Sequence, residues 1–293
     1  MSMPAHIASL ESLLSPVDDQ RTLLLAPGCW DGFSVMLIEQ AGFKAAWVGA
    51  DTVALGRFGR PGVGMLTAGQ MVESVAAIRD RTDLPLLVDA GGGYGNALNV
   101  MRAVKTVELA GASAIQLSDH SFPKRLDDLT ATPLISAADM IGKLKAALDT
   151  RHDALIIART SVMAAEGTRA ALDRAAAYLE VGVDLLMVDG AVTLTKAEDV
   201  ARMMATSAPF VDRMEDATAH LSNDHEALVA RGFGVLLHPK LLLQGLAKAA
   251  PAWLEAFKAG ASMDKRDGGL MTVAALDQLA GLAELSATAR AYS

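Results

Sequence analysis

Two side chains of opposite charge, Asp89 and Arg159, each stand near the end of a short apolar run. A guanidinium binds a carboxylate or phosphate through two parallel hydrogen bonds. A carboxylate binds water, a metal ion or a transferable proton. Asp119 and His120 end a third run, and histidine exchanges protons near neutral pH. These residue types predict a site that holds a small anion and moves protons.

Short apolar runs alternate with longer amphipathic segments along the chain. The expected strands are 23–28, 45–50, 84–90, 114–119, 154–160, 185–190, 209–211 and 234–238. The expected helices are 31–41, 97–109, 137–148, 169–180, 196–204 and 240–248. Continuous apolar runs between helices predict parallel strands that are buried on both faces. Such units build a doubly wound sheet or a closed barrel, and eight of them favour a (β/α)₈ (TIM) barrel.

Glycines support these boundaries. Gly42, Gly111, Gly182 and Gly232 each follow a helical segment, where a left-handed residue ends a helix. No linker or low-complexity tract divides the chain, so we expect one barrel domain over 1–293. Residues 251–293 exceed eight units and are helical in pattern, which predicts a C-terminal helical extension that packs on a partner subunit.

In a (β/α)₈ barrel the residues at the carboxyl ends of the strands line one common mouth. The segments at these positions are 28–30, 49–51, 89–94, 118–120, 159–161, 189–190 and 238. We therefore expect their polar side chains to converge.

Composition excludes several classes of protein. The net charge of −8 and the absence of long basic stretches argue against nucleic-acid binding. No apolar stretch is long enough to span a membrane, and the N-terminus lacks a signal-peptide pattern. The single cysteine, Cys29, is expected to be a buried thiol in a reducing, cytoplasmic location. Nucleotide-binding glycine loops, nucleophile elbows and close zinc-ligand patterns are absent, so no organic cofactor is expected.

Four segments resemble the isocitrate lyase / phosphoenolpyruvate mutase superfamily. They read APGCWD at 26–31, VDAGGGYGN at 88–96, SDHSFPKR at 118–125 and IART at 157–160. Their order and spacing are similar to the family's from about residue 25 to residue 248. The resemblance implies an α/β barrel, often with a swapped C-terminal helix, that forms a homo-oligomer such as a dimer or tetramer. It also implies C–C or C–P bond chemistry on small 2-oxo acids and related carboxylates, with Mg²⁺ stabilising an enolate.

The chain departs from the family at the metal and acid positions. Of the paired acids that hold Mg²⁺ in relatives, Asp89 is kept and the second is Gly91. A further acid is replaced by Ser118, and the acid usual in the loop after the second strand corresponds to Gly62. Residues 124–128 read KRLDD and lack the catalytic cysteine of the lyases, which argues against chemistry that uses this thiol. Mg²⁺ binding, with Asp89 as its ligand, is therefore doubtful.

Two hypotheses follow. The first is a lyase-superfamily enzyme that acts on a small 2-oxo acid or related carboxylate through an enolate. Its expected catalytic residues are Asp89, Asp119, His120 and Arg159. Its expected substrate-binding residues are Trp47, Gly49, Ala50, Asp51, Gly91, Gly92, Ser118, Arg159 and His238. The alternative is a catalytically silent or repurposed barrel that binds a small carboxylate metabolite without Mg²⁺.

Overall fold

A computed structural model describes residues 3–16, 21–122, 133–194, 199, 208–214, 224–261 and 270–292. The chain divides into two compact units, Met1–Lys240 and Leu241–Ser293. The eight strands of the described residues lie in the first unit, and the described part of the second unit contains helices.

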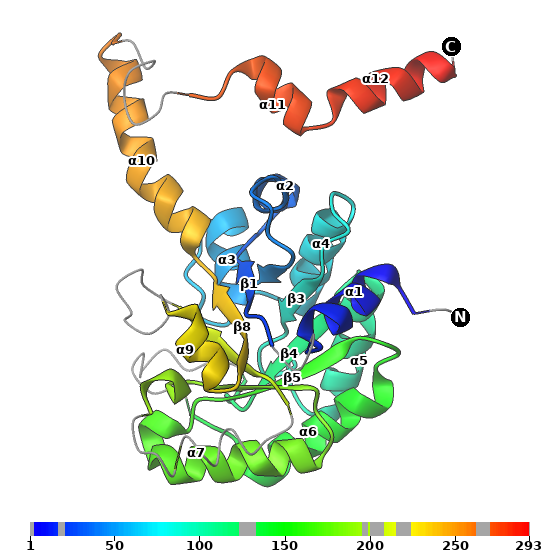
Figure 1. Cartoon of the computed structure of the whole chain (residues 1–293), viewed down its shortest axis with the longest axis vertical. Helices are drawn as coiled ribbons and strands as arrows, with labels where there is room; N and C mark the ends of the chain where they lie inside the picture. Colours follow the sequence, from blue (N-terminus) through cyan, green and yellow to red (C-terminus); the bar gives the residue numbers. More distant parts are fainter. Residues whose placement is uncertain are drawn as a thin grey trace. The chain divides into compact units, whose positions relative to one another are not determined.

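The first unit is a barrel of parallel strands (Figure 1). The strands are β1 Leu24–Pro27, β2 Ala46–Val48, β3 Leu86–Asp89, β4 Ala114–Ser118, β5 Leu155–Thr160, β6 Leu185–Val188, β7 Phe210–Arg213 and β8 Phe233–His238. They pair in the order β1-β8-β7-β6-β5-β4-β3-β2. A parallel bridge between Gly28 and Trp47 joins the two ends, with Cys29 N donating to the Trp47 carbonyl at 2.9 Å. The predicted (β/α)₈ barrel is confirmed.

Alternate residues of each strand point into the barrel and pack on one another. Leu87, Ile157, Met187, Val211 and Leu237 belong to this buried interior, together with further residues of the same strands. Because side chains alternate along a strand, the residues two positions later point to the same side. The interior therefore continues at its carboxyl-terminal edge into Asp89, Arg159, Asp189 and Arg213.

Helices surround the strands (Figure 1). They are α1 Ala5–Leu14, α2 Gly32–Gln40, α3 Ala50–Phe58, α4 Ala68–Arg79, α5 Ala97–Leu109, α6 Ala137–Thr150, α7 Met163–Glu180 and α9 His225–Ala230. The glycines that were expected to end helices have positive φ, from 84° at Gly42 to 109° at Gly111. Sequence patterns did not identify α1, α3, α4 and α9. The helix expected at 196–204 lies almost entirely outside the described residues.

The second unit contains α10 Leu241–Lys258, α11 Val273–Leu279 and α12 Leu282–Ala291. Several of its large apolar side chains are exposed, among them Leu254, Phe257 and Leu285. Its helical character agrees with the expected extension. The boundary of that extension, its packing on a partner and the single-domain organisation stay predictions.

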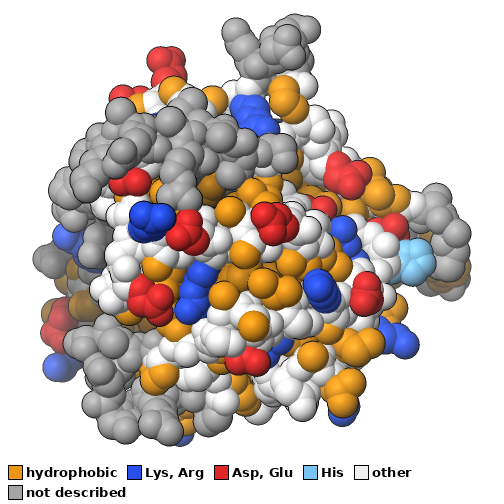
Figure 2. Space-filling view, turned by 90° about the horizontal axis from the view of Figure 1, so that it is seen from below, with side chains coloured by type: hydrophobic (Ala, Val, Ile, Leu, Met, Phe, Trp, Pro, Cys, Tyr) orange, Lys and Arg blue, Asp and Glu red, His pale blue; other side chains and the backbone are white. Residues whose placement is uncertain are grey.

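On one face of the molecule, seen from below in Figure 2, acidic and basic side chains lie interspersed with hydrophobic ones. Among the described helices, none combines the length and apolar character that a membrane crossing requires.

Candidate active site

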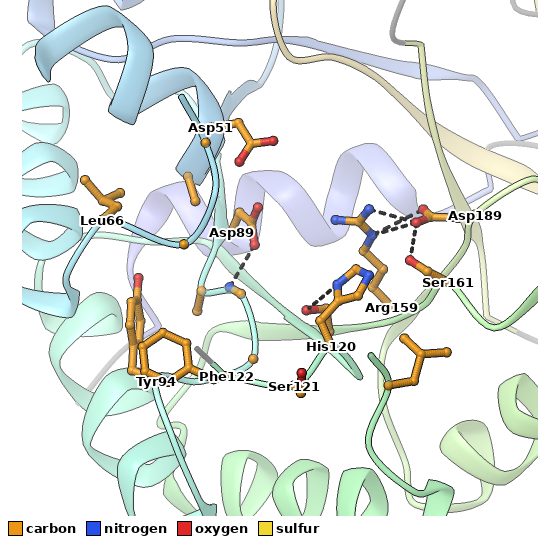
Figure 3. Close-up of a pocket in the computed structure, with 18 of the residues that line it drawn as sticks. Asp51, Leu66, Asp89, Tyr94, His120, Ser121, Phe122, Arg159, Ser161 and Asp189 are labelled. Atoms are coloured by element: carbon orange, nitrogen blue, oxygen red, sulfur yellow. Dashed lines mark hydrogen bonds and ion pairs between the residues drawn. The ribbon is translucent and has the colours of Figure 1, made fainter. Parts of the chain in front are cut away.

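A pocket of about 400 Å³ opens where the carboxyl ends of the strands meet (Figure 3). Its size is typical of sites for small molecules. Most of its polar wall comes from strand ends and the segments that follow them. The charged and polar lining residues are Asp51, Asp89, Tyr94, Ser118, His120, Ser121, Arg159, Ser161, Asp189 and Arg213.

Arg159 and Asp189 form an ion pair at this mouth. Arg159 Nε lies 3.2 Å from both carboxylate oxygens of Asp189, and Nη2 lies 2.7 Å from Oδ2. The hydroxyl of Ser161 also donates to Asp189. The side chain of Arg159 is 10% exposed and that of Asp189 is 25% exposed. The bonds of Nε and Nη2 hold the guanidinium in place on one side. Nη1 takes no part in them and is therefore the donor available to a ligand.

The charges of the pair stabilise each other against burial. Burial alone would lower the pKa of Arg159, but the charge and hydrogen bonds of Asp189, with smaller effects of Asp89 and Asp51, raise it above its ordinary value. Burial would raise the pKa of Asp189, yet Arg159, Arg213 and the Ser161 hydroxyl lower it to about 2. Both groups are therefore charged at neutral pH.

Asp89 faces this pair across the pocket (Figure 3). Its Oδ1 accepts hydrogen bonds from Gly91 N at 2.8 Å and from Gln116 Nε2 at 3.2 Å. These two bonds fix the orientation of the carboxylate, while Oδ2 has no bond of this kind in the described part of the chain. Asp89 thus offers an acceptor to a ligand.

The glycine-rich loop after β3 follows a sharply turned path. Gly91, Gly93 and Tyr94 have φ of 54°, 76° and 59°. A Cβ at Gly93 would lie 2.2 Å from Val100 Cγ2, so packing demands glycine there. A Cβ at Gly91 would meet no atom within 4 Å, so at that position the positive φ, rather than crowding, favours glycine. The side chain of Lys143 on α6 secures the loop by donating to the Gly92 carbonyl at 2.9 Å.

His120 and Ser118 form a polar wall of the pocket beside Arg159. His120 Nδ1 lies 3.3 Å from Ser118 Oγ, and both residues line the cavity. Tyr94 and Phe122 meet edge to face, with ring centroids 6.0 Å apart, and supply the apolar side. An imidazole and a hydroxyl at this edge are suited to hydrogen bonding and proton transfer.

The structure brings eight of the predicted site residues to the pocket. These are Ala50, Asp51, Asp89, Gly91, Gly92, Ser118, His120 and Arg159. Sequence patterns missed the role of Asp189 as the partner of Arg159, although its strand-end position marked it. They also missed Arg213, because the seventh run was expected to end at 211, two residues before this guanidinium. A predicted seventh strand that extended to residue 213 would have placed Arg213 at a strand end and so at the mouth of the barrel.

Asp119, predicted as catalytic, does not line the pocket. Its carboxylate is completely buried and accepts from Arg174 Nη1 at 3.1 Å, Tyr178 OH at 3.2 Å and Ser161 N at 3.3 Å. Arg174 and Tyr178 belong to α7, on the outside of the barrel. Because Ser118 points inward, its neighbour Asp119 points outward. The geometry gives Asp119 a structural role that ties α7 to β4.

Trp47, Gly49 and His238 are also absent from the pocket wall. Trp47 is 3% exposed and packs in the barrel interior. Gly49 precedes α3, and a Cβ there would lie 2.5 Å from the Trp47 indole nitrogen. His238 follows the inward-facing Leu237, so its side chain leaves the interior. The thiol of Cys29 is buried as expected, and burial raises its pKa.

The side chains present do not fit the multi-acid Mg²⁺ site that the sequence resemblance implies. Mg²⁺ prefers oxygen ligands in octahedral geometry, usually including carboxylates. Gly91 has no side-chain oxygen, Ser118 offers only a hydroxyl, and one oxygen of Asp89 already accepts two hydrogen bonds. Within the ranges that the structure describes, no three His, Cys, Asp or Glu side chains gather into a metal-binding group.

Comparisons with known proteins agree with the fold and the resemblance. Residues 14–257 match the family model for phosphoenolpyruvate phosphomutase. The chain is 32% identical over 247 residues to 2,3-dimethylmalate lyase from Eubacterium barkeri, covering 83% of this chain and 82% of that protein. It is 35% identical over 257 residues to oxaloacetate decarboxylase from Rhodopseudomonas palustris (strain BisB5), covering 87% and 82%.

A solved structure of phosphonopyruvate hydrolase with oxalate and Mg²⁺ superposes with a TM-score of 0.80 at 25% identity, covering 96% of this chain and 97% of that one. The named relatives are enzymes, so these comparisons do not support the alternative of a catalytically silent barrel. They confirm the prediction of an enzyme of the isocitrate lyase / phosphoenolpyruvate mutase superfamily. The chain belongs to the phosphoenolpyruvate phosphomutase family of that superfamily.

Proposed function

We propose that the protein cleaves a C–C bond in a small 2-oxo acid or related carboxylate, and that Arg159 binds the substrate carboxylate. The observation that carries this proposal is the guanidinium of Arg159, which Asp189 holds at the pocket wall opposite Asp89. A fixed guanidinium in a small, partly apolar pocket is suited to a planar carboxylate. The relatives that act on dimethylmalate and oxaloacetate support this class of substrate.

The proposed reaction passes through an enolate. When the C–C bond breaks, one fragment leaves as CO₂, or as a carbonyl compound after its hydroxyl proton passes to a base such as the Asp89 carboxylate. The electron pair of the bond stays with the other fragment, and negative charge collects on its carbonyl oxygen. Donors that already point at this oxygen lower the barrier. Arg159 and Arg213 are the cationic side chains of the described pocket wall. The enolate then takes up a proton at carbon, and His120 lies at the wall to deliver it.

Mg²⁺ has no role in this step, because the described side chains do not fit a multi-acid site. The guanidinium groups of Arg159 and Arg213 stabilise the enolate instead. Turnover is therefore expected to persist in excess EDTA.

A coupled assay tests the proposal. The protein is incubated with oxaloacetate, 4-hydroxy-2-oxo acids and dimethylmalate, with EDTA or Mg²⁺, and pyruvate is measured with lactate dehydrogenase and NADH. The negative control is the double variant Arg159→Met/Asp189→Asn, which removes both charges of this ion pair together. We expect one compound to be cleaved with kcat/KM on the order of a hundredfold above this variant. Equal rates for all compounds in both proteins would contradict the proposal.

A further inference from the structure

Asp51 lies in the first turn of α3, and its carboxylate points into the pocket (Figure 3). Gly62, in the loop after α3, also lines the pocket. A Cβ built at Gly62 would lie 2.1 Å from Asp51 Oδ1 and 2.2 Å from Asp51 Cγ. Such distances are far below van der Waals contact. The Asp51 carboxylate thus occupies the volume that any side chain at position 62 would need.

The described pocket wall carries more negative than positive side chains. Asp51, Asp89 and Asp189 line it together with Arg159 and Arg213. Asp189 is paired with Arg159, so its charge and that of the guanidinium largely offset each other. On the remaining wall two carboxylates face one guanidinium, and without Asp51 these charges would balance. Asp51 therefore decides whether its end of the pocket repels an anion.

Asp51 also acts on Arg159 across the cavity. Burial lowers the pKa of Arg159, but Asp189, Asp89 and Asp51 together raise it, so the Asp51 carboxylate is within electrostatic range of the anion-binding group. A ligand bound at Arg159 will sense the charge of Asp51 at its far end.

We infer that Asp51 is a specificity-determining residue, placed in the space that Gly62 leaves open. It selects ligands with a carboxylate at Arg159 and an uncharged, hydrogen-bond-donating group, such as a hydroxyl or amide, at the end that faces Asp51 and Asp89. This inference rests on the proposed function and narrows its substrate class to acids whose distal end carries no charge.

Oxalate and oxamate form a matched pair of probes. They have nearly the same shape, but oxamate has a neutral amide where oxalate has a second carboxylate. Isothermal titration of each into the wild type, Asp51→Asn and Asp149→Asn gives the ratio of the two Kd values. Asp149 is exposed on α6 and is not part of the pocket, so its variant controls for net charge. We expect the wild type to prefer oxamate, and Asp51→Asn to shift the ratio about tenfold toward oxalate.

Substitutions of Gly62 test whether a side chain at position 62 and the Asp51 carboxylate compete for the same space. In the wild-type background, Gly62→Ala forces the Asp51 carboxylate to move and is expected to change the oxalate-to-oxamate ratio at least fivefold. In the Asp51→Ala background the volume is empty, and the same substitution is expected to change the ratio less than twofold. Thermal unfolding of each variant checks that the fold is kept.

These titrations distinguish a failure of the role of Asp51 from a failure of the proposed function. Binding of both probes with the same ratio in the wild type and Asp51→Asn overturns the role of Asp51 and leaves the proposed function intact. Equal effects of Gly62→Ala in both backgrounds overturn the link between the two positions. If neither anion binds the wild type, the proposed function fails and this inference fails with it.

Discussion

Replacing Asp189 with asparagine keeps the size of the side chain and removes its charge. The pKa of Asp189 is 3.8 in its ordinary state and about 2 here, because Arg159, Arg213 and Ser161 overcome the opposing effect of burial. At about 1.4 kcal/mol per pKa unit, the folded state gains about 2 kcal/mol from the ionised form. The Asp189→Asn variant is expected to lose about this amount of unfolding free energy at pH 7.

The pH dependence of this loss follows from the direction of the shift. A lowered carboxyl pKa stabilises the fold fully above the unfolded value of 3.8, and this contribution disappears as the pH falls through about 2. The difference between wild type and Asp189→Asn should therefore shrink to about half at pH 3. Urea unfolding at pH 7 and pH 3, with equal slopes for both proteins, measures it.

A matched control separates this pair from ordinary surface charges. Asp173 forms an exposed pair with Arg169 at 3.9 Å, so Asp173→Asn should change the unfolding free energy by less than about 0.5 kcal/mol. The reasoning about Asp189 is refuted if Asp189→Asn is as stable as wild type at pH 7. It is also refuted if the difference stays the same at pH 3.

Three further predictions concern other parts of the barrel. Asp119→Ala leaves Arg174 without its buried carboxylate and should lower the free energy of unfolding in urea by about 3–5 kcal/mol. The kcat of the folded fraction should stay near wild type. A large fall in kcat without a loss of stability would show that Asp119 is catalytic. Because burial raises the pKa of Cys29, its thiol should react with a disulfide reagent at pH 8 only after the protein is denatured. Fast reaction of the native protein would contradict this. The pKa of His6 is lowered to about 4, chiefly by burial and also by Arg79. The free energy of unfolding should therefore fall as the pH falls from about 6.5 to 4. A His6→Gln variant whose unfolding free energy depends on pH as that of the wild type does would contradict this.

The sequence predicted the barrel because its strands are continuous apolar runs that end in polar residues or glycine. It missed α3, because Ala50, which begins this helix, continues an apolar run and therefore has the pattern of a strand end. It missed α4 although a capping signal was present, since Thr67 and Gln70 bond to each other's backbone at the start of this helix. Weighing such local signals would have recovered α4.

The site was partly predictable for a similar reason. Strand-end position predicted that Asp89 and Arg159 line the common mouth, and both line the pocket. It predicted the same for Asp119, which does not line the pocket. Alternation along β4 sends Ser118 inward and Asp119 outward, and this parity is readable from the sequence once the strand is placed. The pairing of Arg159 with Asp189 depends on the register of two strands, in which Arg159 lies opposite Met187. No local pattern contains that register.

Binding of oxamate to EDTA-treated protein tests the central claim most directly, which is that Arg159 holds a ligand carboxylate without a divalent cation. Isothermal titration should show binding in EDTA to the wild type and a loss on the order of a hundredfold in Arg159→Met/Asp189→Asn. Binding that requires added Mg²⁺, or equal affinity in the double variant, would contradict the claim.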